Sequence, residues 1–369
     1  MNLYFSHHIF STQAFGGISR YFVELARELD QERNDLTIKI VSPFFVNSYL
    51  PELPSSLFIG RKAPRPKRGL RVLTGINQAL SIAYFAAKSG IYHETYYNRF
   101  SALKASSSFA KVTTVYDCIH EIFPDQFSPR DHTSKLKKET VDRADLVLCV
   151  SDSTKKDLIQ RFNVNPQKIR VTHLGFTPMK IADQQTPFAE NRPDRPYLLF
   201  VGNRGIYKNG RRMMEAFASS IARREGMLLV FFGGESVSQA ERDWISSNGL
   251  EQQIVFVRGD DKKLAQYYQG ATAFVFPSLY EGFGLPLLEA MSAGCPVLCS
   301  NTSSFPEVAR DAALYFDPTQ VEAITSALNE FINDSTLRDH LIKKGFENIR
   351  DFTWKKCANL TLSAYKELN

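Results

Sequence analysis

Residues 274–300 read FVFPSLYEGFGLPLLEAMSAGCPVLCS, and this run contains a strand, a glycine loop, a short helix and the start of a second strand. The apolar run Ala271–Phe276 is short and rich in aromatic and β-branched residues, and it ends at Pro277, as a buried parallel strand does. A second apolar run follows Pro296. The stretch therefore predicts one strand–loop–helix–strand unit of a parallel sheet.

The loop between these strands combines residues that favour a close approach to a ligand. Gly282 and Gly284 carry no Cβ, so the backbone can come near a bound group. Pro286 suits a first helical position, and Gly294 suits a left-handed cap. We expect a helix over residues 287–293.

Two glutamates bracket the loop, Glu281 within it and Glu289 in the expected first turn of the helix. A helix N-terminus favours a diphosphate, which leaves the carboxylates to accept hydrogen bonds from neutral hydroxyls. The spacing therefore indicates a nucleotide-sugar site, and the competing interpretation is two capping or surface charges. A dinucleotide fingerprint fails because Leu287 holds the third glycine position.

The bulk composition is that of an ordinary globular protein. The 369 residues allow two domains, 43% are hydrophobic and 23% are charged. The five cysteines form no Cys-x-x-Cys pair, which favours reduced thiols in a cytoplasmic protein. The sequence shows no signal peptide and no run of ~20 apolar residues, so no membrane span is expected.

The net charge of +6 is unevenly distributed, with six basic residues among the twelve of Gly60–Arg71 and a second basic stretch at Arg130–Arg143. One interpretation is attraction to an anionic membrane surface or a lipid-diphosphate acceptor, with peripheral binding at the inner face of the cell membrane. The alternative is a solvated loop. No module typical of nucleic-acid binding accompanies these residues.

Strands alternate with helices along the whole chain, which predicts parallel sheets with helices on both faces. Residues 177–196 hold four prolines and little periodicity, so the domain boundary is expected there. We expect an N-terminal domain over residues 1–180 and a C-terminal domain over residues 190–352. A final helix, residues 353–369, would pack back on the first domain.

The string PSLYEGFGLPLLEAMSAGCPV resembles the Glu-x7-Glu motif of the family 4 retaining glycosyltransferases. The resemblance covers most of the chain and is tightest from Tyr197 to Pro306. It implies the GT-B architecture, two doubly wound Rossmann-like domains facing a central cleft, with the N-terminal domain on the acceptor side and the C-terminal domain binding the nucleotide sugar. The strings YLLFVGNRGIYKNGRRMMEAF and VYDCIHEIFPD are most similar to bacterial mannosyltransferases of O-antigen, lipopolysaccharide and capsule assembly.

The resemblance also implies roles for residues of the second domain. Glu289 would hold the ribose, and Glu281 with the backbone of the loop would hold the sugar. Lys208 and Arg204 would bind the diphosphate, although Asn203 occupies the arginine position of the family pattern and Arg204 stands one place later. The donor-binding set in this domain is Asn203, Arg258, Gly282, Phe283, Gly284, Leu285 and Glu289.

In the first domain, Gly16 and Gly17 precede a predicted helix, where members of this family carry a glycine pair facing the donor diphosphate. A tight turn is the alternative. His120 follows a predicted strand beside Asp117 and Glu121. Family members place a donor-sugar histidine after this strand, and a structural histidine is the alternative. His7, His8 and His93 are weaker candidates of the same kind.

These observations predict a retaining hexosyltransferase that uses a GDP- or UDP-linked sugar as substrate and a glycan or polyprenyl-linked saccharide as acceptor. No cofactor and no metal are expected, because the sequence lacks an Asp-x-Asp triplet and supplies two cations for the diphosphate. Two alternatives remain open: a GT-B epimerase or phosphorylase, and a non-catalytic subunit that binds sugar nucleotides.

Overall fold

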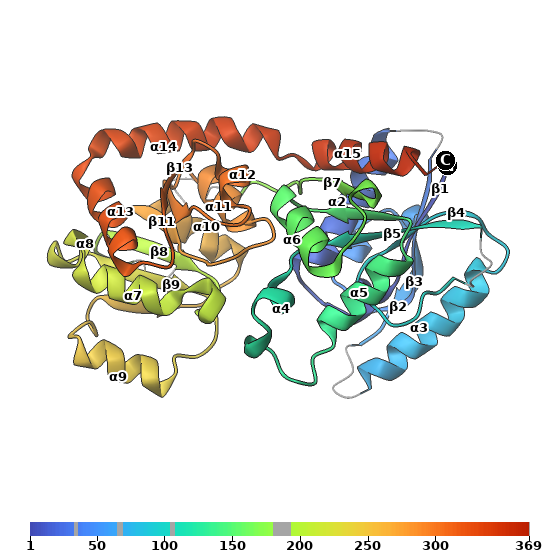
Figure 1. Cartoon of the computed structure of the whole chain (residues 1–369), viewed down its shortest axis with the longest axis horizontal. Helices are drawn as coiled ribbons and strands as arrows, with labels where there is room; N and C mark the ends of the chain where they lie inside the picture. The colour runs from blue at the N-terminus through green and yellow to red at the C-terminus, as the bar shows by residue number, and fades with distance from the viewer. Residues whose placement is uncertain (33–35, 65–68, 104–107, 180–192, 369) are drawn as a thin grey trace. The chain divides into compact units, whose positions relative to one another are not determined.

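The computed structural model describes residues 1–32, 36–64, 69–103, 108–179 and 193–368. The chain divides into two compact units, one formed by Met1–Gly175 with Thr353–Asn369 and the other by Phe176–Phe352. Residues 180–192 of the predicted linker lie outside the described residues. Each unit contains one parallel sheet with helices packed on it (Figure 1).

The first unit contains a seven-stranded sheet in the order β3-β2-β1-β4-β5-β6-β7, with every strand pair parallel. Its strands are β1 Asn2–Phe5, β2 Thr37–Phe45, β3 Phe58–Lys62, β4 Gly90–Glu94, β5 Phe109–Val115, β6 Leu146–Cys149 and β7 Ile169–Val171. Its helices are α1 His8–Thr12, α2 Gly17–Glu32, α3 Leu70–Phe85, α4 Ile119–Ile122, α5 Thr133–Arg143, α6 Asp152–Phe162 and α15 Trp354–Lys366.

The second unit contains a six-stranded parallel sheet in the order β10-β9-β8-β11-β12-β13. Its strands are β8 Tyr197–Val201, β9 Leu228–Phe232, β10 Ile254–Val257, β11 Ala273–Phe276, β12 Val297–Ser300 and β13 Ala313–Phe316. Its helices are α7 Gly210–Ser219, α8 Ile221–Arg224, α9 Gln239–Ser247, α10 Asp261–Gly270, α11 Leu285–Ser292, α12 Phe305–Ala309, α13 Val321–Asn333 and α14 Ser335–Asn348.

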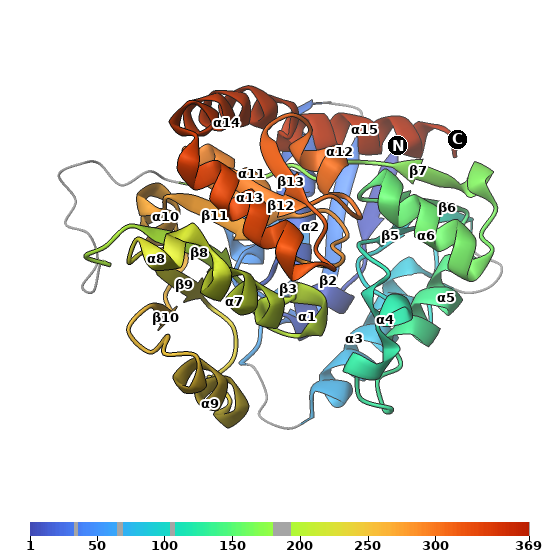
Figure 2. The same cartoon turned by 60° about the vertical axis from the view of Figure 1, so that its left-hand side comes forward.

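The strands β11 and β12 are buried along their whole length, as continuous apolar runs of a covered parallel sheet should be. Helices α7 and α13 lie side by side on one face of this sheet (Figure 2). Their apolar faces and the strands form one hydrophobic core, which includes Phe200, Phe217, Phe231 and Leu328. The two doubly wound, Rossmann-like units confirm the predicted fold class.

Helix α15 follows the second unit in the sequence and belongs to the first, where it packs along α2 (Figure 1). Its N-cap Thr353 accepts a hydrogen bond from the Lys356 amide, and the Trp354 ring lies 6.4 Å from the ring of Tyr21. The helix is therefore part of the core of a unit whose other residues lie far away in the sequence.

The structure corrects three local expectations. Gly60–Lys62 form the end of the edge strand β3, because this segment pairs with β2 after a register shift, and they are not part of a loop. The apolar run NLYFSHHIFS at the N-terminus predicts a strand, but its residues His8–Thr12 form helix α1. Helix α11 begins at Leu285, with Pro286 in its first turn, so Glu289 lies in the second turn of the helix.

All five cysteines are buried free thiols. Burial raises the pKa of each of them, which makes them poor nucleophiles. Among the described residues, no helix is both long enough and apolar enough to cross a bilayer.

Candidate active site

The carboxyl ends of the second unit's strands define the candidate site, because the order of the strands reverses between β8 and β11. Ligands of open α/β sheets bind at such a switch point, beyond the carboxyl ends of the strands. Two loops leave the sheet there, residues 202–209 after β8 and residues 277–284 after β11. They carry Lys208 and Glu281.

Lys208 and Glu281 form an ion pair between these two loops. The Nζ atom of Lys208 donates to Oε1 of Glu281 at 2.5 Å, and the two side chains are only 15% and 13% exposed. The Lys208 ammonium also lies 5.1 Å from the centre of the Phe276 ring. The structure thus brings together a cation and a carboxylate that the sequence separates by 73 residues.

Asn209 fixes the position of this lysine. Its backbone is left-handed, with φ of 62°, and its side-chain amide donates to the carbonyls of Pro277 at 3.0 Å and Pro318 at 2.7 Å. The amide of Leu279 donates to the carbonyl of Tyr207 at 2.7 Å. The short 3₁₀ turn that carries Lys208 is therefore attached directly to the loop after β11.

Two serines that sequence reasoning missed hold the glycine loop. The Glu281 amide donates to Oγ of Ser303 at 3.0 Å, and the Ser303 hydroxyl also contacts the Glu281 carbonyl. The Ser304 hydroxyl lies 2.9 Å from the carbonyl oxygens of Glu281 and Phe283. The available signal was their position directly after β12, whose carboxyl end adjoins that of β11.

Gly284 is the N-cap of α11 and adopts φ of +96°, which disfavours any residue with a Cβ. A Cβ at this position would lie 3.1 Å from Leu287 Cδ1 and 3.3 Å from Phe305 Cε1. The predicted residues Gly282 and Leu285 adjoin it in the same segment. The positive end of the helix therefore starts in the same loop as Glu281.

The two remaining predicted residues of this stretch, Phe283 and Glu289, have neighbours within the unit. Oε2 of Glu289 accepts a hydrogen bond from the Tyr268 hydroxyl at 3.4 Å. Burial raises the pKa of Tyr268 well above its usual value, and the Glu289 carboxylate adds to the rise. The Phe283 ring is 4% exposed and lies edge-on to Phe352 at 5.8 Å, so its side chain contributes to packing.

Arg204, predicted to bind the diphosphate together with Lys208, forms an ion pair with Glu241 in this structure. Its Nε atom donates to Oε1 of Glu241 at 2.7 Å, its side chain is 6% exposed, and its guanidinium lies 4.8 Å from the Phe256 ring centre. Burial alone would raise the pKa of Glu241, but hydrogen bonds from Arg204 and Ser238 hold this pKa below its usual range. Arg204 is therefore held within the second unit by Glu241.

Arg204 and Arg258 both contact the loop after β9. Arg204 Nη2 lies 3.4 Å from the Ser236 carbonyl, and Arg258 Nη2 donates to the Ser236 hydroxyl at 3.4 Å. Asn203 is exposed beside them. The predicted set therefore forms two groups, one around the Lys208–Glu281 pair and one on the β9 loop.

In the first unit, the glycine pair leads into α2, which begins at Gly17. The side chain of Gln13 folds over this end, and its Oε1 accepts from the Ser19 amide at 3.1 Å. A Cβ on Gly16 would lie 2.2 Å from Gln13 Nε2. The close approach that the missing Cβ of Gly16 permits is therefore to Gln13. A pocket of about 440 Å³ adjoins Gln13 and Phe15.

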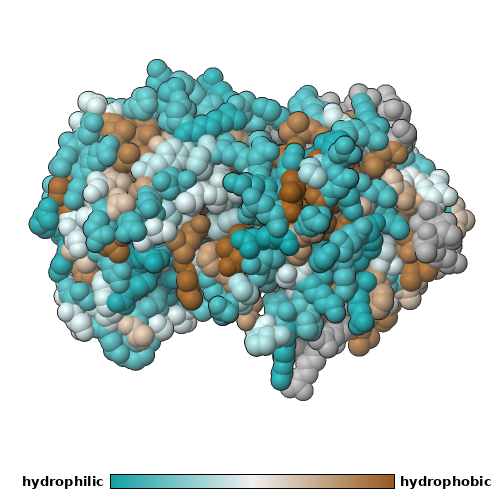
Figure 3. Space-filling view, in the orientation of Figure 1, coloured by the Kyte–Doolittle hydropathy of each residue, from teal (hydrophilic) through white to brown (hydrophobic). Residues whose placement is uncertain are grey.

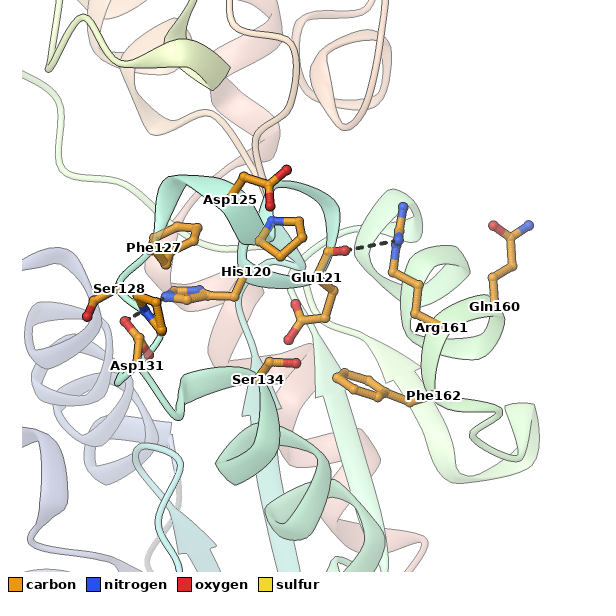
Figure 4. A pocket seen from close by; sticks show the side chains of 12 residues that line it. His120, Glu121, Asp125, Phe127, Ser128, Asp131, Ser134, Gln160, Arg161 and Phe162 are labelled. Atoms are coloured by element: carbon orange, nitrogen blue, oxygen red, sulfur yellow. Dashed lines mark hydrogen bonds and ion pairs between the residues drawn. The ribbon is translucent and has the colours of Figure 1, made fainter.

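His120 lies in α4, a short helix after β5. Its Nε2 is 3.6 Å from Oδ2 of Asp131, and its ring stacks on Phe127 with centroids 3.8 Å apart (Figure 4). Its Nδ1 is buried without a hydrogen-bond partner among the described residues. His120 also lines a pocket of the first unit, together with Phe127 and Asp131.

The other histidine candidates are internal. His93 is fully buried, with Nδ1 2.6 Å from the Tyr365 hydroxyl and Nε2 2.9 Å from Oγ1 of Thr114, so it joins β4 and β5 to α15. Burial lowers the pKa of His93 to about 3 and that of His7 to about 4. The half-buried His8 ring is tilted against that of His7, with ring centroids 4.1 Å apart.

Comparisons with known proteins identify a family for each unit. The "Glycosyltransferase Family 4" model matches residues 15–178, and the "Glycosyl transferases group 1" model matches residues 182–348. The chain is 28% identical over 386 residues to the O-antigen chain mannosyltransferase B of Escherichia coli, covering 95% of this chain and 96% of that protein.

Two solved structures share the fold over the whole chain. Sucrose-phosphate synthase from Thermosynechococcus elongatus superposes with a TM-score of 0.73 at 21% identity, covering 100% of this chain and 99% of that one. WaaG, a glycosyltransferase involved in lipopolysaccharide biosynthesis, superposes with a TM-score of 0.67 at 18% identity, covering 99% of this chain and 98% of that one. With one family model matching each unit, the chain belongs to the family 4 glycosyltransferases.

Proposed function

We propose that this protein transfers a hexosyl group, with mannose favoured, from a GDP- or UDP-linked sugar to a glycan or polyprenyl-linked saccharide. The transfer would serve the assembly of a cell-surface polysaccharide such as O-antigen. The O-antigen mannosyltransferase relative, which is similar over nearly the whole chain, supports the sugar and the pathway class. The family membership supports the nucleotide-sugar donor.

The observation that carries this proposal is the Lys208–Glu281 ion pair at the switch point of the sheet. Negative charge grows on the diphosphate as the glycosidic bond stretches, and Lys208, paired with Glu281 of the loop that leads into α11, would stabilise it together with the positive end of that helix. Glu281 can accept hydrogen bonds from sugar hydroxyls and steady positive charge on the sugar ring. Glu289, in the second turn of α11, would hold the ribose.

We further propose that the transfer proceeds with retention and without a metal ion. The acceptor would attack from the face that the diphosphate leaves, and a phosphate oxygen would take the acceptor proton. Both cations have carboxylate partners, Lys208 in Glu281 and Arg204 in Glu241. We assign the diphosphate first to Lys208, because it lies at the switch point of the sheet, whereas Arg204 contacts the loop after β9 and would have to exchange partners to assist.

Incubation with GDP-mannose, other GDP- and UDP-sugars and a panel of saccharide acceptors tests this function. We expect transfer that persists in EDTA, and NMR of the first product should show the donor's anomeric configuration. Incubation with the donor and no acceptor discriminates the alternative enzymes. A changed stereocentre in the donor sugar indicates an epimerase, and cleavage of the donor only when inorganic phosphate is added indicates a phosphorylase. Absence of both transfer and donor hydrolysis would leave the non-catalytic subunit.

The surface of α3 supports a membrane partner. Its outward positions carry Val72, Ile76 and Leu80, which are 66%, 45% and 46% exposed and spaced by four residues along one face. On its inner side Asn77 is fully buried and bonds to Ser11 and to the backbone of Phe44. The helix therefore turns its apolar side outward (Figure 3).

Basic residues adjoin this apolar face. Lys88 lies 4.7 Å from the ring of Tyr84, near the end of α3, and exposed Arg99 precedes Phe100, whose carbonyl accepts from Gln78 of the helix. An apolar face flanked by cations is typical of helices that lie in the interface of an anionic bilayer. We propose that α3, rather than the basic loop alone, provides the contact with the membrane. Residues 65–68 of that loop lie outside the described residues.

A further inference from the structure

The loop that carries Lys208, residues 202–209, is attached to the rest of the second unit on two sides. At its end, the side chain of Asn209 donates to carbonyls of the loops after β11 and β13. Near its start, Arg204 contacts the loop after β9 and the first turn of α9, which lies at the lower edge of the second unit in Figure 1. The charged partner of this second attachment is Glu241.

The guanidinium of Arg204 makes several contacts at once. Its Nε donates to Oε1 of Glu241 at 2.7 Å and its Nη2 to Oε2 at 3.4 Å, and Nη2 also donates to the Glu235 carbonyl at 3.1 Å. The guanidinium lies 4.8 Å from the ring centre of Phe256 and 5.9 Å from that of Phe231. Because these are charge-assisted hydrogen bonds and cation–π contacts of a nearly buried side chain, release of Arg204 to a ligand would forfeit all of them together.

Two glycines let the backbone close around Arg204. A Cβ on Gly210, the first residue of α7, would lie 2.7 Å from Cβ of Arg204 and 3.1 Å from its carbonyl oxygen. A Cβ on Gly234, whose φ is +74°, would lie 2.7 Å from the Gly202 carbonyl oxygen and 3.2 Å from Nη1 of Arg204. Nη1 is buried and has no hydrogen-bond partner among the described residues. A phosphate therefore cannot reach this atom unless the loop moves.

A short backbone path connects Arg204 to the lysine. Gly205 follows Arg204 directly and is the N-cap of the 3₁₀ turn Ile206–Lys208. The Lys208 amide donates to the Gly205 carbonyl at 2.9 Å, and the Asn209 amide donates to the same carbonyl at 3.0 Å. A restraint on Arg204 is therefore also a restraint on the turn that carries the Lys208 ammonium.

We propose that Glu241 is a positioning residue for glycosyl transfer, because it holds Arg204 and thereby fixes the turn of Lys208 at the switch point of the sheet. The ion pair stays closed when the donor binds, so Arg204 is not a ligand of the diphosphate. The proposal rests on the function proposed above, in which Lys208 stabilises the leaving diphosphate. In the competing hypothesis Glu241 withholds Arg204 from the diphosphate, and the two hypotheses predict opposite effects when Glu241 is removed.

Steady-state kinetics of the full chain separates these hypotheses. Glu241→Ala should lower kcat by about tenfold, with a smaller effect on KM for the donor, because a distant substitution that misplaces a reacting group by about 1 Å can cost up to about a hundredfold. In the Lys208→Ala background the same substitution should cause no further loss, because both act through one ammonium. Asp243→Ala removes an exposed carboxylate of the same helix and should retain the kcat of the wild type.

Two kinetic results would overturn the proposal. A rise in kcat or in donor affinity in Glu241→Ala would assign Arg204 to the diphosphate. A further loss of kcat in the Lys208→Ala background would show that Glu241 acts elsewhere. Circular dichroism must show that Glu241→Ala is folded, and Glu241→Gln, which keeps the size of the side chain and removes its charge, gives the same comparison if the alanine variant does not fold.

Acetylation of lysines with acetic anhydride, followed by mass spectrometry, tests the position of Lys208 without any transfer reaction. Lys208 should react slowly in the wild type, because its side chain is 15% exposed and paired with Glu281, whereas the exposed Lys262 should react fast. We expect Glu241→Ala to raise the rate at Lys208 several-fold and to leave Lys262 unchanged.

An unchanged rate at Lys208 in the folded variant would overturn the positioning role, even if the wild type transfers sugar. A raised rate at Lys208 in a protein that transfers no sugar would refute the proposed function only.

Discussion

The Lys208 ammonium is the group to which we assign charge stabilisation in the transition state. A charge-assisted hydrogen bond contributes about 1.5–3 kcal/mol, and about 1.4 kcal/mol corresponds to a tenfold rate change. We expect Lys208→Ala to lower kcat by roughly ten- to a hundredfold, with a smaller effect on donor affinity. Steady-state kinetics checks this, and Lys262→Ala, which removes an exposed lysine of α10, is the matched control.

The 2.5 Å contact makes the effects of Lys208 and Glu281 interdependent. Glu281→Gln keeps the shape and removes the charge, so kcat should fall while the fold survives. In the double variant, the loss should be smaller than the sum of the two single losses, because each substitution already breaks the same ion pair. Near-normal kcat in both single variants would show that the pair is only structural.

Buried histidines predict a loss of stability in mild acid. The pKa of His93 is lowered by burial to about 3, whereas the unfolded chain protonates near the usual value of 6.5. Stability contributed by neutral His93 is therefore present above pH 6.5 and is lost as the pH falls towards 3, by up to about 1.4 kcal/mol per pH unit. Urea unfolding between pH 7 and 4.5 measures this slope.

His93→Gln should make that slope shallower, whereas His132→Gln, at the exposed start of α5, should keep it. An unchanged slope in His93→Gln would assign the acid sensitivity to other groups, such as His7, whose pKa is also lowered by burial, to about 4.

At the scale of elements, the start of α11 depends on one backbone conformation. Gly284→Ala places a Cβ at φ of +96° and about 3.1 Å from Leu287 Cδ1. Gly226→Ala has a similar φ of +76° but meets no atom within 4 Å. We expect about 1 kcal/mol of destabilisation for Gly226→Ala from the backbone alone, and about 2 kcal/mol or more for Gly284→Ala. Thermal unfolding compares them, and equal losses would show that Leu287 and Phe305 adapt freely.

The outward face of α3 predicts how the protein meets a membrane. Val72→Glu with Ile76→Glu should abolish sedimentation with liposomes that contain anionic lipid, because the substitutions bring carboxylates to the bilayer. Binding by the wild type should weaken as salt rises, since exposed charges are screened within ~8 Å at physiological ionic strength. A matched control is Ile82→Glu, an exposed isoleucine on another side of the same helix. Unchanged sedimentation of the double variant would leave this face without a membrane role.

At the scale of the whole molecule, α15 makes the first unit discontinuous in sequence. Truncation after Phe352 would expose the apolar side of α2 and remove the Tyr365 hydroxyl from His93. We expect the first unit to lose its fold while the second stays compact. Limited proteolysis with mass spectrometry should then recover residues of the second unit as the resistant fragment. Equal resistance of both units would show that α15 is dispensable.

The sequence by itself determined the class of the fold and the central motif, because both depend on local patterns. Buried parallel strands need continuous apolar runs, and glycines with a following proline set the start of α11 near the predicted position. These constraints act within about ten residues, so they can be read from the run 274–300. Gly284 and Gly294 both have a positive φ, which residues with a Cβ disfavour, so the two glycines mark these turns in the sequence itself.

Only the tertiary structure decided which charges meet. It joined Lys208 to Glu281 through the contacts of Asn209, turned Arg204 to Glu241, and placed Ser303 and Ser304 under the glycine loop. It also turned the apolar side of α3 outward. The physical reason is that the partner of a charged side chain is set by the register of strands distant in sequence, and no local pattern records that register.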